Sequence, residues 1–541
     1  MLRITGIELP ASFARDCDLR LKTAEMLKID PAAFTSFRIA KKSLDARRKS
    51  DIRFVFTVEA SLEGERRFLS SPNVSLSEEA AVHPIIPALR RSEDIPRPVV
   101  VGSGPAGLMA ALVLAEAGLR PIIIERGKTA RERKKDVDSL WRGKGLDPES
   151  NVQFGEGGAG AFSDGKLTTG IKDTRCGYVL GEFVKAGAPE EILYLAKPHI
   201  GTDKLLPMVE SMRNKIVSLG GEFRFEQKLT DVNISGGQVR SLEVEAAAPS
   251  GLSANSPNKR YILSCERVIL AIGHSARDTF EMLLSRGVSM QQKAFSVGLR
   301  IEHPQRLINS AQYGGAAGLP PADYKLSAQL SNGKGVYTFC MCPGGYVVCA
   351  SSEENRLAVN GMSYYSRSGE NANSALLVSV DGKDFLSDHP LAGVEYQRLL
   401  ENRAYTLGGG GCTAPAQRVE DFLNNERSLG FTDVRPSYLP GVAPANLSRL
   451  FSADISDSLK EGIRRFSNKL SGFDHPGAVL TGIETRSSSP VRILRNDKYE
   501  SNVSGLIPCG EGCGYAGGIM SAAVDGVRCA EAVLEGYTIA N

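Results

Sequence analysis

Hydrophobic and polar positions alternate in short runs over the first 90 residues. Phe54, Phe56 and Val58 occupy every second position of one run, a spacing that predicts a strand with one buried face. The segment DLRLKTAEMLK instead has helical spacing. Several strands around one helix predict a small α+β domain, which we expect to be ferredoxin-like. The proline-punctuated stretch HPIIPALRRSEDIPRP then predicts a linker.

The pattern changes at residue 99, where apolar residues become almost continuous. VVV ends at a glycine, an alanine- and leucine-rich stretch follows, and PIIIE comes next. A membrane span needs about 20 uninterrupted apolar residues, whereas glycines, Pro105, Glu116 and Arg120 interrupt this stretch. A strand, a tight turn, a helix and a second strand explain every interruption.

The turn between the first strand and the helix predicts a dinucleotide site. Gly102, Gly104 and Gly107 form G-x-G-x-x-G there, and Glu125 ends the second strand. The first glycine permits the turn, the second lets backbone approach a pyrophosphate, and the third lets the helix pack on the strand. The helix N-terminus favours phosphate, and the acid accepts hydrogen bonds from a ribose. A glycine-rich loop without function is the alternative, but it does not account for Glu125.

The C-terminal segment GLIPCGEGCGYAGGIMSAAVDG favours FAD as the dinucleotide. A predicted strand meets Glu511, and a glycine-rich turn opens a helix near Ile519. This segment resembles the second signature of glutathione-reductase-like FAD proteins, in which the acid binds the ribityl chain. RVILAIGHSARD resembles the strand-to-turn crossing of the same superfamily. Bound NAD as the only dinucleotide is the alternative. No second G-x-G-x-x-G precedes a helix and an acid, so we expect no separate nicotinamide domain.

The stretch FGEGGAGAFSDGKL, which begins at residue 154, is too rich in glycine for a helix or a strand. In related flavoproteins, which this chain resembles, a glycine-rich loop at this place passes along the isoalloxazine, and bare backbone lets a chain lie against a flat ring. We therefore interpret Gly157, Gly158 and Ala159 as flavin contacts. Ser163, Asp164 and Lys166 would supply polar contacts to the cofactor or act in catalysis. A surface loop is the alternative, although the two phenylalanines favour an anchored loop.

These motifs together resemble one family, the uncharacterised FAD-dependent dehydrogenases or oxidoreductases of bacteria and plastids, within the glutathione-reductase-like FAD superfamily. The resemblance also rests on KKSLDARRKSDI, VGLRIEHPQ, MCPGGYVV, NGMSYYSR, GGGGCTAPAQRVEDF and GIETRSSSPVRI, so it extends over nearly the whole chain. More distantly, the layout resembles geranylgeranyl reductases and p-hydroxybenzoate-hydroxylase-like enzymes. The resemblance implies a fold and FAD, but no particular substrate.

The expected fold class is α/β, with a Rossmann-like FAD-binding domain, an inserted mostly-β substrate domain and the small N-terminal α+β domain. We expect the inserted domain to cover the flavin and shape the substrate pocket. The predicted boundaries are 1–90 for the N-terminal domain, 96–175, 203–285 and 475–541 for three pieces of the FAD-binding domain, 176–202 for a connection, and 286–474 for the inserted domain.

Three residues are candidates for catalysis, each with a structural role as the alternative. Cys342 would donate a proton or act as a nucleophile if its pKa were depressed. Arg486, beside three serines, would recognise an anion, and Asp164 is the third candidate. The predicted cofactor-binding residues are Gly102, Gly104, Pro105, Ala106, Gly107, Glu125, Arg126, Gly157, Gly158, Ala159, Lys166, Leu229, Ala271, Gly273, Gly510, Glu511, Gly517, Gly518 and Ile519.

Net charge and cysteine content bear on the expected cellular compartment and on the expected binding partners. The chain has 541 residues and a net charge of +3, which argues neither for nor against a polyanionic partner. Ten cysteines are too sparse for a disulfide scaffold and lack zinc-like spacing, so we predict reduced thiols, no metal and a cytoplasmic location. The N-terminus has no signal-peptide pattern.

The expected function is FAD-dependent oxidoreduction, as a dehydrogenase or a reductase. Hydride or electrons would pass between FAD and a small organic substrate that is anionic or partly apolar; the electron partner and the oligomeric state stay open. The alternative is flavin-dependent RNA modification that uses the basic stretch Lys41–Lys49. A solvated face is the favoured interpretation of this stretch, because Asp45 and Asp51 interleave with its basic residues.

Overall fold

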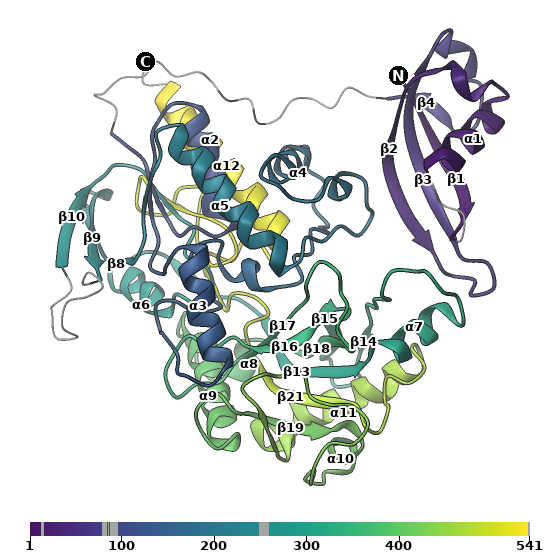
Figure 1. Cartoon of the computed structure of the whole chain (residues 1–541). Helices are drawn as coiled ribbons and strands as arrows, with labels where there is room; N and C mark the ends of the chain where they lie inside the picture. Colours follow the sequence, from purple (N-terminus) through teal and green to yellow (C-terminus); the bar gives the residue numbers. More distant parts are fainter. Residues whose placement is uncertain (12–15, 78–83, 85, 87–95, 248–258, 539–541) are drawn as a thin grey trace.

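The computed structural model describes the chain except residues 12–15, 78–83, 85, 87–95, 248–258 and 539–541. Figure 1 shows a small N-terminal domain, a nucleotide-binding part and a β-rich domain. Most of the predicted linker before residue 96 lies outside the described residues.

The N-terminal domain is a four-stranded antiparallel sheet with one helix packed on it. Its elements are β1 (Leu2–Pro10), α1 (Asp16–Leu27), β2 (Phe34–Asp45), β3 (Arg53–Leu62) and β4 (Val74–Leu76), with short 3-10 helices at Pro31–Ala33 and Glu65–Phe68. The strand order is β2-β3-β1-β4. Alternate residues of β1, such as Leu2 and Ile4, share a core with Leu19 and Leu27 of α1. The domain is α+β, as the alternating pattern predicted.

Edge strand β2 is joined to the rest of the molecule by its backbone. The Lys42 N–H donates to the carbonyl of Tyr194 at 2.7 Å, and the Ala196 N–H donates to the carbonyl of Lys42 at 2.9 Å. Ile52, at the tip of the β2–β3 hairpin, belongs to the hydrophobic core of the β-rich domain. Backbone pairing and apolar burial therefore dock the N-terminal domain, and a potentially exposed sheet edge is covered.

The nucleotide-binding part is built on a five-stranded parallel sheet. Its strand order is β23-β11-β5-β6-β7, so neighbouring strands come from distant parts of the chain, as a Rossmann-like fold requires. All three residues of β5, β6, β11 and β23 are buried, which explains their continuous apolar runs. The bounds are β5 (Val99–Val101), β6 (Ile122–Ile124), β7 (Glu222–Arg224), β11 (Val268–Leu270) and β23 (Leu506–Pro508).

Helices cover one face of this sheet and a second sheet covers the other. Figure 1 shows α2, α5 and α12 side by side, and they share one core with Val100, Ile123 and Ile269. The opposite core joins Val99 and Val101 to β8, β9 and β10. The bounds are α2 (Pro105–Glu116), α3 (Ala130–Trp141), α4 (Arg175–Lys185), α5 (Thr202–Ser218), α6 (Arg277–Ser285), α12 (Ile519–Thr538), β8 (Gln227–Ser235), β9 (Gln238–Ala246) and β10 (Lys259–Ser264), with 3-10 helices at Ala159–Phe162 and Glu190–Leu193.

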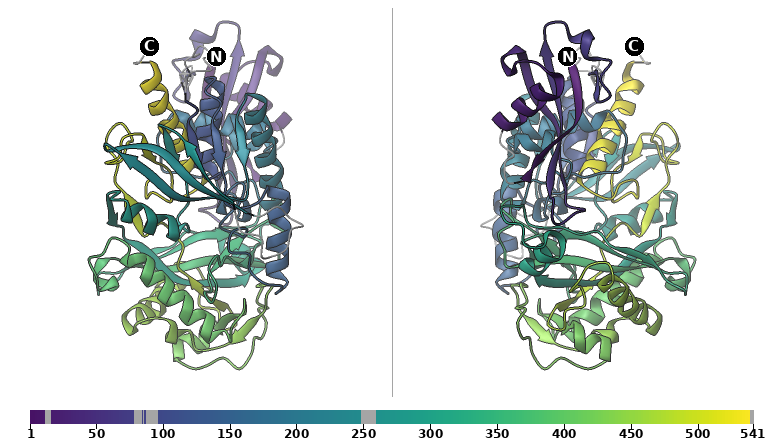
Figure 2. Two further views of the ribbon diagram at one scale, coloured as in Figure 1. Left: turned by 90° about the vertical axis from the view of Figure 1, so that its left-hand side faces the viewer. Right: turned by 90° about the vertical axis from the view of Figure 1, so that its right-hand side faces the viewer.

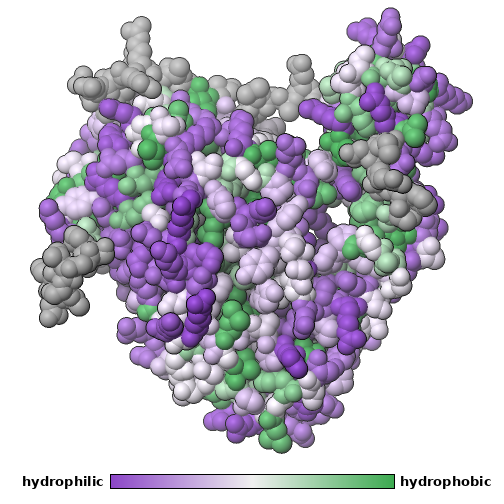
Figure 3. Space-filling model, viewed as in Figure 1, coloured by the Kyte–Doolittle hydropathy of each residue, from purple (hydrophilic) through white to green (hydrophobic). Residues whose placement is uncertain are grey.

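The apolar stretch that begins at Val99 folds as β5, α2 and β6, as predicted. Among the described residues, no helix combines the length and apolar character needed to cross a membrane. The space-filling view shows polar residues over most of the visible face, with apolar residues in small scattered spots (Figure 3).

The β-rich domain is built on a seven-stranded sheet of order β14-β15-β18-β13-β21-β19-β20. Helices α9 and α11 share its core, and the side views place the helices of this domain beneath the sheet (Figure 2). The opposite face is turned toward the nucleotide-binding part. The bounds are β13 (Phe295–Pro304), β14 (Ser327–Gln329), β15 (Gly335–Cys342), β18 (Asn371–Val380), β19 (Ala414–Arg418), β20 (Val442–Pro444), β21 (Val479–Glu484), α7 (Gln305–Tyr313), α8 (Gly382–Phe385), α9 (Ala392–Leu407), α10 (Val419–Asn424), α11 (Ala453–Ser467) and the 3-10 helix Leu447–Leu450. Two small sheets pair β16 (Tyr346–Cys349) with β17 (Val359–Met362) and β12 (Met290–Gln292) with β22 (Val491–Ile493).

One predicted boundary differs from the division between the sheets. Strand β21 lies in the range expected for the last nucleotide-binding piece, 475–541, but it pairs with β13 and β19 of the seven-stranded sheet. Since backbone pairing ties β21 to that sheet, the β-rich domain includes Glu484, and the last nucleotide-binding piece begins after it. The other boundaries stay predictions.

Candidate active site

One cavity extends from the carboxyl ends of the parallel strands to the seven-stranded sheet. Ligands bind at this edge of α/β sheets because glycine turns and helix N-termini meet there. All predicted cofactor-binding residues except Gly107 and Gly157 line the cavity, as do the candidates Cys342, Asp164 and Arg486. The structure brings these residues together, while their contacts with a bound cofactor stay predictions.

The β-rich domain supplies the far end of this cavity. We call its lining residues the β-domain end; they are Phe339, Cys340, Cys342, Asn360, Gly361, Glu484, Arg486 and Ser487. They come from β15, from β17, and from the last residue of β21 with the loop that follows it. The cavity therefore has a nucleotide end made by one domain and a β-domain end made by another.

Bare backbone borders the nucleotide end. A Cβ atom added at Gly273, Gly517 or Gly518 would meet no atom within 4 Å, so these glycines face open space. Helices α2 and α12 begin beside this space, at Pro105 and Ile519. Their N-terminal N–H groups favour phosphate and carbonyl oxygens. The residues present therefore fit a dinucleotide.

Gly107 and Gly157 lie outside the cavity for different reasons. A Cβ at Gly107 would lie 1.9 Å from the carbonyl oxygen of Gly102, so this glycine permits the close helix–strand packing predicted for it. A Cβ at Gly157 would lie 3.1 Å from Val209 of α5, and the Gly157 N–H donates to the Ser103 carbonyl at 2.9 Å. Gly157 therefore ties its loop to the first glycine turn and to α5, and its interpretation as a flavin contact stays a prediction.

Glu125 is buried and holds three loops together. One carboxylate oxygen accepts from the N–H of Ser103 at 2.9 Å and from its hydroxyl at 2.7 Å. The other accepts from the N–H of Gly127 at 2.9 Å and of Gly155 at 3.0 Å. A carboxylate has about four acceptor positions, so a ribose hydroxyl bound to Glu125 would replace one of these donors.

Two further predicted residues have partners near the nucleotide end. Arg126 forms ion pairs with Glu149 at 2.6 Å and Asp278 at 2.8 Å, and its guanidinium lies 4.1 Å from the centre of the Phe154 ring. Glu511 lies 3.4 Å from Nδ1 of His274. A histidine beside the predicted ribityl-binding acid adds a polar contact that spacing along the chain did not assign.

Asp164 is buried between two cations. Lys166 Nζ lies 2.7 Å from its carboxylate, and Arg367 donates to it from Nε at 3.0 Å and Nη2 at 2.6 Å. Burial raises the pKa of a carboxyl, but Lys166 and Arg367 outweigh it and hold the pKa of Asp164 well below its usual range. Asp164 is therefore a permanent anion and a poor catalytic base. Two positive charges meet one negative charge, which leaves this cluster with a surplus of one positive charge.

Arg486 lines the cavity, but its guanidinium is already paired. Nε and Nη2 each lie 3.0 Å from a carboxylate oxygen of Glu401, and Nη1 donates to the Ser275 and Ser352 hydroxyls at 3.1 and 2.5 Å. Glu401 also pairs with Arg277 at 2.8 Å. Burial raises the pKa of Glu401, but the two arginines prevail and keep it far below its usual range. Arg486 is therefore a partner in a buried ion-pair cluster, and this pairing disfavours the predicted role in anion recognition.

Both thiols of β15 line the cavity, but Cys340 is exposed whereas the predicted candidate Cys342 is buried. A β-bulge between Phe339 and Cys342 interrupts β15, and Cys340 has a φ of 41° there. Cys342 is buried and its Sγ donates to the Cys340 carbonyl at 3.2 Å. Regular alternation would place both thiols on one face of the strand, and the bulge separates them. Because the protein surrounds the cavity, burial raises the pKa of the Cys340 thiol to about 12 and also raises that of Cys342. Neither thiol is a thiolate near neutral pH.

A buried pair beneath the β-domain end was missed by the sequence reasoning. Arg300 of β13 and Glu484 of β21 form a bidentate pair, with one contact of 3.1 Å. Arg300 also donates to the Cys340 carbonyl at 2.9 Å, to Asn373 at 3.1 Å and to Asn360 at 2.7 Å. The signal that could have found the pair was a charged residue in the middle of the apolar run FSVGLRI.

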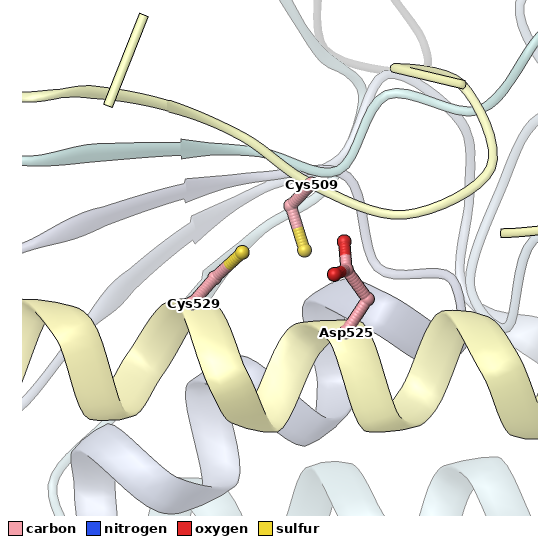
Figure 4. Close-up of side chains that lie close together, drawn as sticks. All are labelled: Cys509, Asp525 and Cys529. Atoms are coloured by element: carbon pink, nitrogen blue, oxygen red, sulfur yellow. The ribbon is translucent and has the colours of Figure 1, made fainter. Parts of the chain in front are cut away.

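A cluster of Cys509, Asp525 and Cys529 lies below the nucleotide end (Figure 4). The sulfur and oxygen atoms lie within 4.8 Å of one another, but Arg495 already binds Asp525 at 2.9 and 2.7 Å and lies 3.6 Å from Cys529 Sγ. A guanidinium in this position disfavours a metal ion by charge repulsion. Asp525 also accepts from the N–H of Gly510 at 2.8 Å, so the cluster supports the turn that carries Glu511.

The parallel sheet, its glycine turns and the cavity define a Rossmann-like FAD-binding protein with a second, β-rich domain. The family models that match it are a domain of unknown function, DUF8436, over residues 1–61, an FAD binding domain over residues 97–150, and the family described as FAD-dependent protein, C-terminal domain-like, over residues 294–487. FAD is therefore the cofactor.

A protein of Clostridium beijerinckii, described as uncharacterized, is 46% identical over 550 residues, which cover 99% of each chain. The chain belongs with this relative to the family of FAD-dependent proteins that carry the matched C-terminal domain, which confirms the resemblance.

Two solved structures resemble the chain at low identity. The flavin-dependent brominase Bmp2 has a TM-score of 0.38 and 14% identity, with coverage of 82% of this chain and 79% of its own. A geranylgeranyl bacteriochlorophyll reductase-like protein of Thermoplasma acidophilum has a TM-score of 0.34 and 11% identity, with the same coverage. Similarity at this level carries no argument about the reaction.

Proposed function

We propose that this chain is an FAD-dependent oxidoreductase that exchanges a hydride or electrons with a small organic substrate. The observation that supports the proposal is the two-ended cavity: FAD motifs form one end, and side chains of a different domain form the other. A bound flavin supplies two-electron redox chemistry. We assign substrate binding to the β-domain end, where Phe339, Cys340 and Asn360 face the cavity.

Lys166 is the residue that we propose to act electrostatically on the cofactor. It shares a loop with Gly158 and Ala159, lines the cavity and belongs to the cluster with one surplus positive charge. Positive charge beside a flavin favours its reduced form, because reduction adds negative charge. Asp164 would act as a positioning residue that holds the ammonium group in place.

The electron partner is proposed to be something other than a free nicotinamide nucleotide. Of the sheets formed by the described residues, the five-stranded sheet is the one that is parallel throughout, and its turns are assigned to FAD. We expect slow reduction when the FAD-loaded protein is mixed anaerobically with NADH or NADPH. Rapid, saturable bleaching of the flavin in a stopped-flow experiment would contradict this.

The proposed function is tested by reduction and reoxidation of the flavin. The full chain with FAD is photoreduced without oxygen and then mixed with neutral and charged quinones, enones and imines, with free reduced FAD as the control. We expect saturable recovery of the oxidised spectrum with at least one acceptor. Recovery that never exceeds the rate of free FAD, for any acceptor, would argue for a binding protein without this activity.

Further proposals concern the fold of the N-terminal domain, RNA modification, the cellular location and the direction of the reaction. We propose that the N-terminal domain is ferredoxin-like, with the 3-10 helix Glu65–Phe68 in place of its second helix. RNA modification gains no support from two residues of the basic stretch, because Arg47 pairs with Asp45 and the Lys42 ammonium group lies 4.6 Å from the centre of the Phe54 ring. A cytoplasmic location and a dehydrogenase direction stay predictions.

A further inference from the structure

We infer that the substrate is a neutral, largely apolar molecule that offers a hydrogen-bond acceptor, such as a carbonyl oxygen. This inference rests on the proposed oxidoreductase function and names the substrate class for the same site. It follows from the charged side chains around the β-domain end, whose hydrogen-bonding groups are almost all engaged within the protein. It also follows from the one side-chain amide at this end, whose donor has no partner in the described structure.

Arg300 has no donor left for a ligand. Its five N–H groups are all used, by both oxygens of Glu484, by the side-chain oxygens of Asn360 and Asn373, and by the Cys340 carbonyl. Its side chain is fully buried and Glu484 is nearly so. The pair therefore presents no net charge and no free guanidinium edge to the cavity.

Most of the hydrogen-bond donors of Arg486 are also used within the protein. Four of its five N–H groups donate to Glu401, Ser275 and Ser352. Lys166 carries the surplus positive charge of its cluster and lines the cavity, where its ammonium group donates to Asp164 and to the Met341 carbonyl of β15. Two of its three N–H groups are therefore engaged within the protein, and we assign the third to the cofactor, because the same loop carries the predicted flavin contacts Gly158 and Ala159. An anionic substrate at the β-domain end would leave water without meeting an unpaired cation, which is costly in a surrounded cavity. The charge pattern therefore favours a neutral molecule.

Asn360 supplies the uncommitted donor. Its side-chain oxygen accepts from Arg300 Nη2 at 2.7 Å and from the N–H of Gly361 at 2.8 Å. An arginine can only donate, so this contact fixes which atom of the amide is the oxygen. The NH2 group of this cavity-lining side chain has no described partner and is available to an acceptor. Phe339 and the protonated Cys340 thiol add apolar surface beside it.

The inference is tested with 2-naphthamide and 2-naphthoate, which have nearly the same shape and differ in charge. Each is titrated into the oxidised, FAD-loaded full chain, and binding is measured from the flavin difference spectrum. We expect the amide to bind at least about tenfold more tightly, a difference of about 1.4 kcal/mol. Naphthoate that binds as tightly as the amide, or no spectral change with either ligand, overturns the inference.

Variants locate the binding site. Asn360→Leu should weaken 2-naphthamide about tenfold, because it removes the free donor, whereas Asn468→Leu, at an exposed asparagine after α11, should leave the affinity unchanged. Should Asn360→Leu fail to fold, Asn360→Ser removes the amide with a smaller change and carries the same expectation. Equal affinities in wild type and the Asn360 variant contradict the assigned contact.

Reoxidation of the photoreduced enzyme by a neutral naphthoquinone separates the two proposals. If reoxidation is faster than for free reduced FAD while naphthoate is the preferred ligand, only the substrate class is wrong. If no acceptor outpaces free FAD, the oxidoreductase function itself fails.

Discussion

The two ends of the cavity are formed by different kinds of chemical groups. At the nucleotide end, glycine backbone and two helix N-termini border the open space beside side chains such as those of Arg126, Phe154 and Lys228. At the β-domain end, Arg300, Glu484, Arg486 and Glu401 form ion pairs whose members are far apart in sequence. The first end follows from short local motifs, whereas the second depends on the whole fold. The two ends should therefore respond differently to substitution, one in cofactor retention and the other in stability and substrate choice.

The largest expected effect comes from breaking the Arg300–Glu484 pair. Arg300→Met leaves a carboxylate in a nearly fully buried position, and removing one partner of a buried pair typically costs about 3–5 kcal/mol. We expect a lower thermal midpoint and weaker protection of the β-rich domain in hydrogen exchange.

The double variant Arg300→Met/Glu484→Leu is the matched control for this effect. Replacing both charges avoids the unpaired carboxylate, so most of the lost stability should return. If the double variant is less stable than Arg300→Met, the pair is not the source of the effect.

An acid titration tests the second ion-pair cluster. The pKa of Glu401 is lowered in the folded protein, so its stabilising effect is complete above its unfolded pKa of about 4.3 and declines as pH falls below that value. Glu401→Gln should lose about 3 kcal/mol at neutral pH, and its deficit relative to wild type should shrink as pH falls below about 4. Denaturant unfolding at several pH values measures this, and a deficit that is constant with pH would contradict the assignment.

The cluster of Asp164, Lys166 and Arg367 should act mainly on the flavin potential. Asp164→Asn raises the local surplus of positive charge and should shift the potential upward, and Lys166→Met should shift it downward. A unit charge at about 5 Å and an effective dielectric of about 20 contributes roughly 3 kcal/mol, or on the order of 0.1 V for one electron, before screening by water. Spectroelectrochemical titration measures both variants, and unchanged potentials would place the cluster away from the ring.

The smallest expected effect concerns the two thiols of β15. The Cys340 side chain is exposed to the cavity with a pKa of about 12, so a small alkylating reagent should modify it slowly at neutral pH, with a rate that rises about tenfold for each unit of pH up to that value. Buried Cys342 should stay unmodified. Peptide mapping by mass spectrometry reports both sites, and preferential labelling of Cys342 would contradict the bulge.

Local patterns determined the nucleotide end. The strand, the turn at Gly102 and Gly104, the helix and Glu125 lie within one short stretch, so spacing along the chain was enough to predict their arrangement. The turns that carry Gly273 and Glu511 meet the same cavity for a related reason, because each turn follows a strand of one parallel sheet. The alternating and continuous apolar runs likewise predicted the α+β domain and the buried strands.

Only the tertiary structure decided which side chains pair at the β-domain end and which of them are exposed to the cavity. Glu401 lies 85 positions from Arg486 and Glu484 lies 184 positions from Arg300, so the sequence could not indicate that these charges neutralise each other. The sequence could not indicate the pairing that disfavours Arg486 as an anion site, because a side chain's free charge depends on partners that only folding brings near. The different exposure of Cys340 and Cys342 has a similar origin, since a bulge of one residue interrupts the regular alternation of β15.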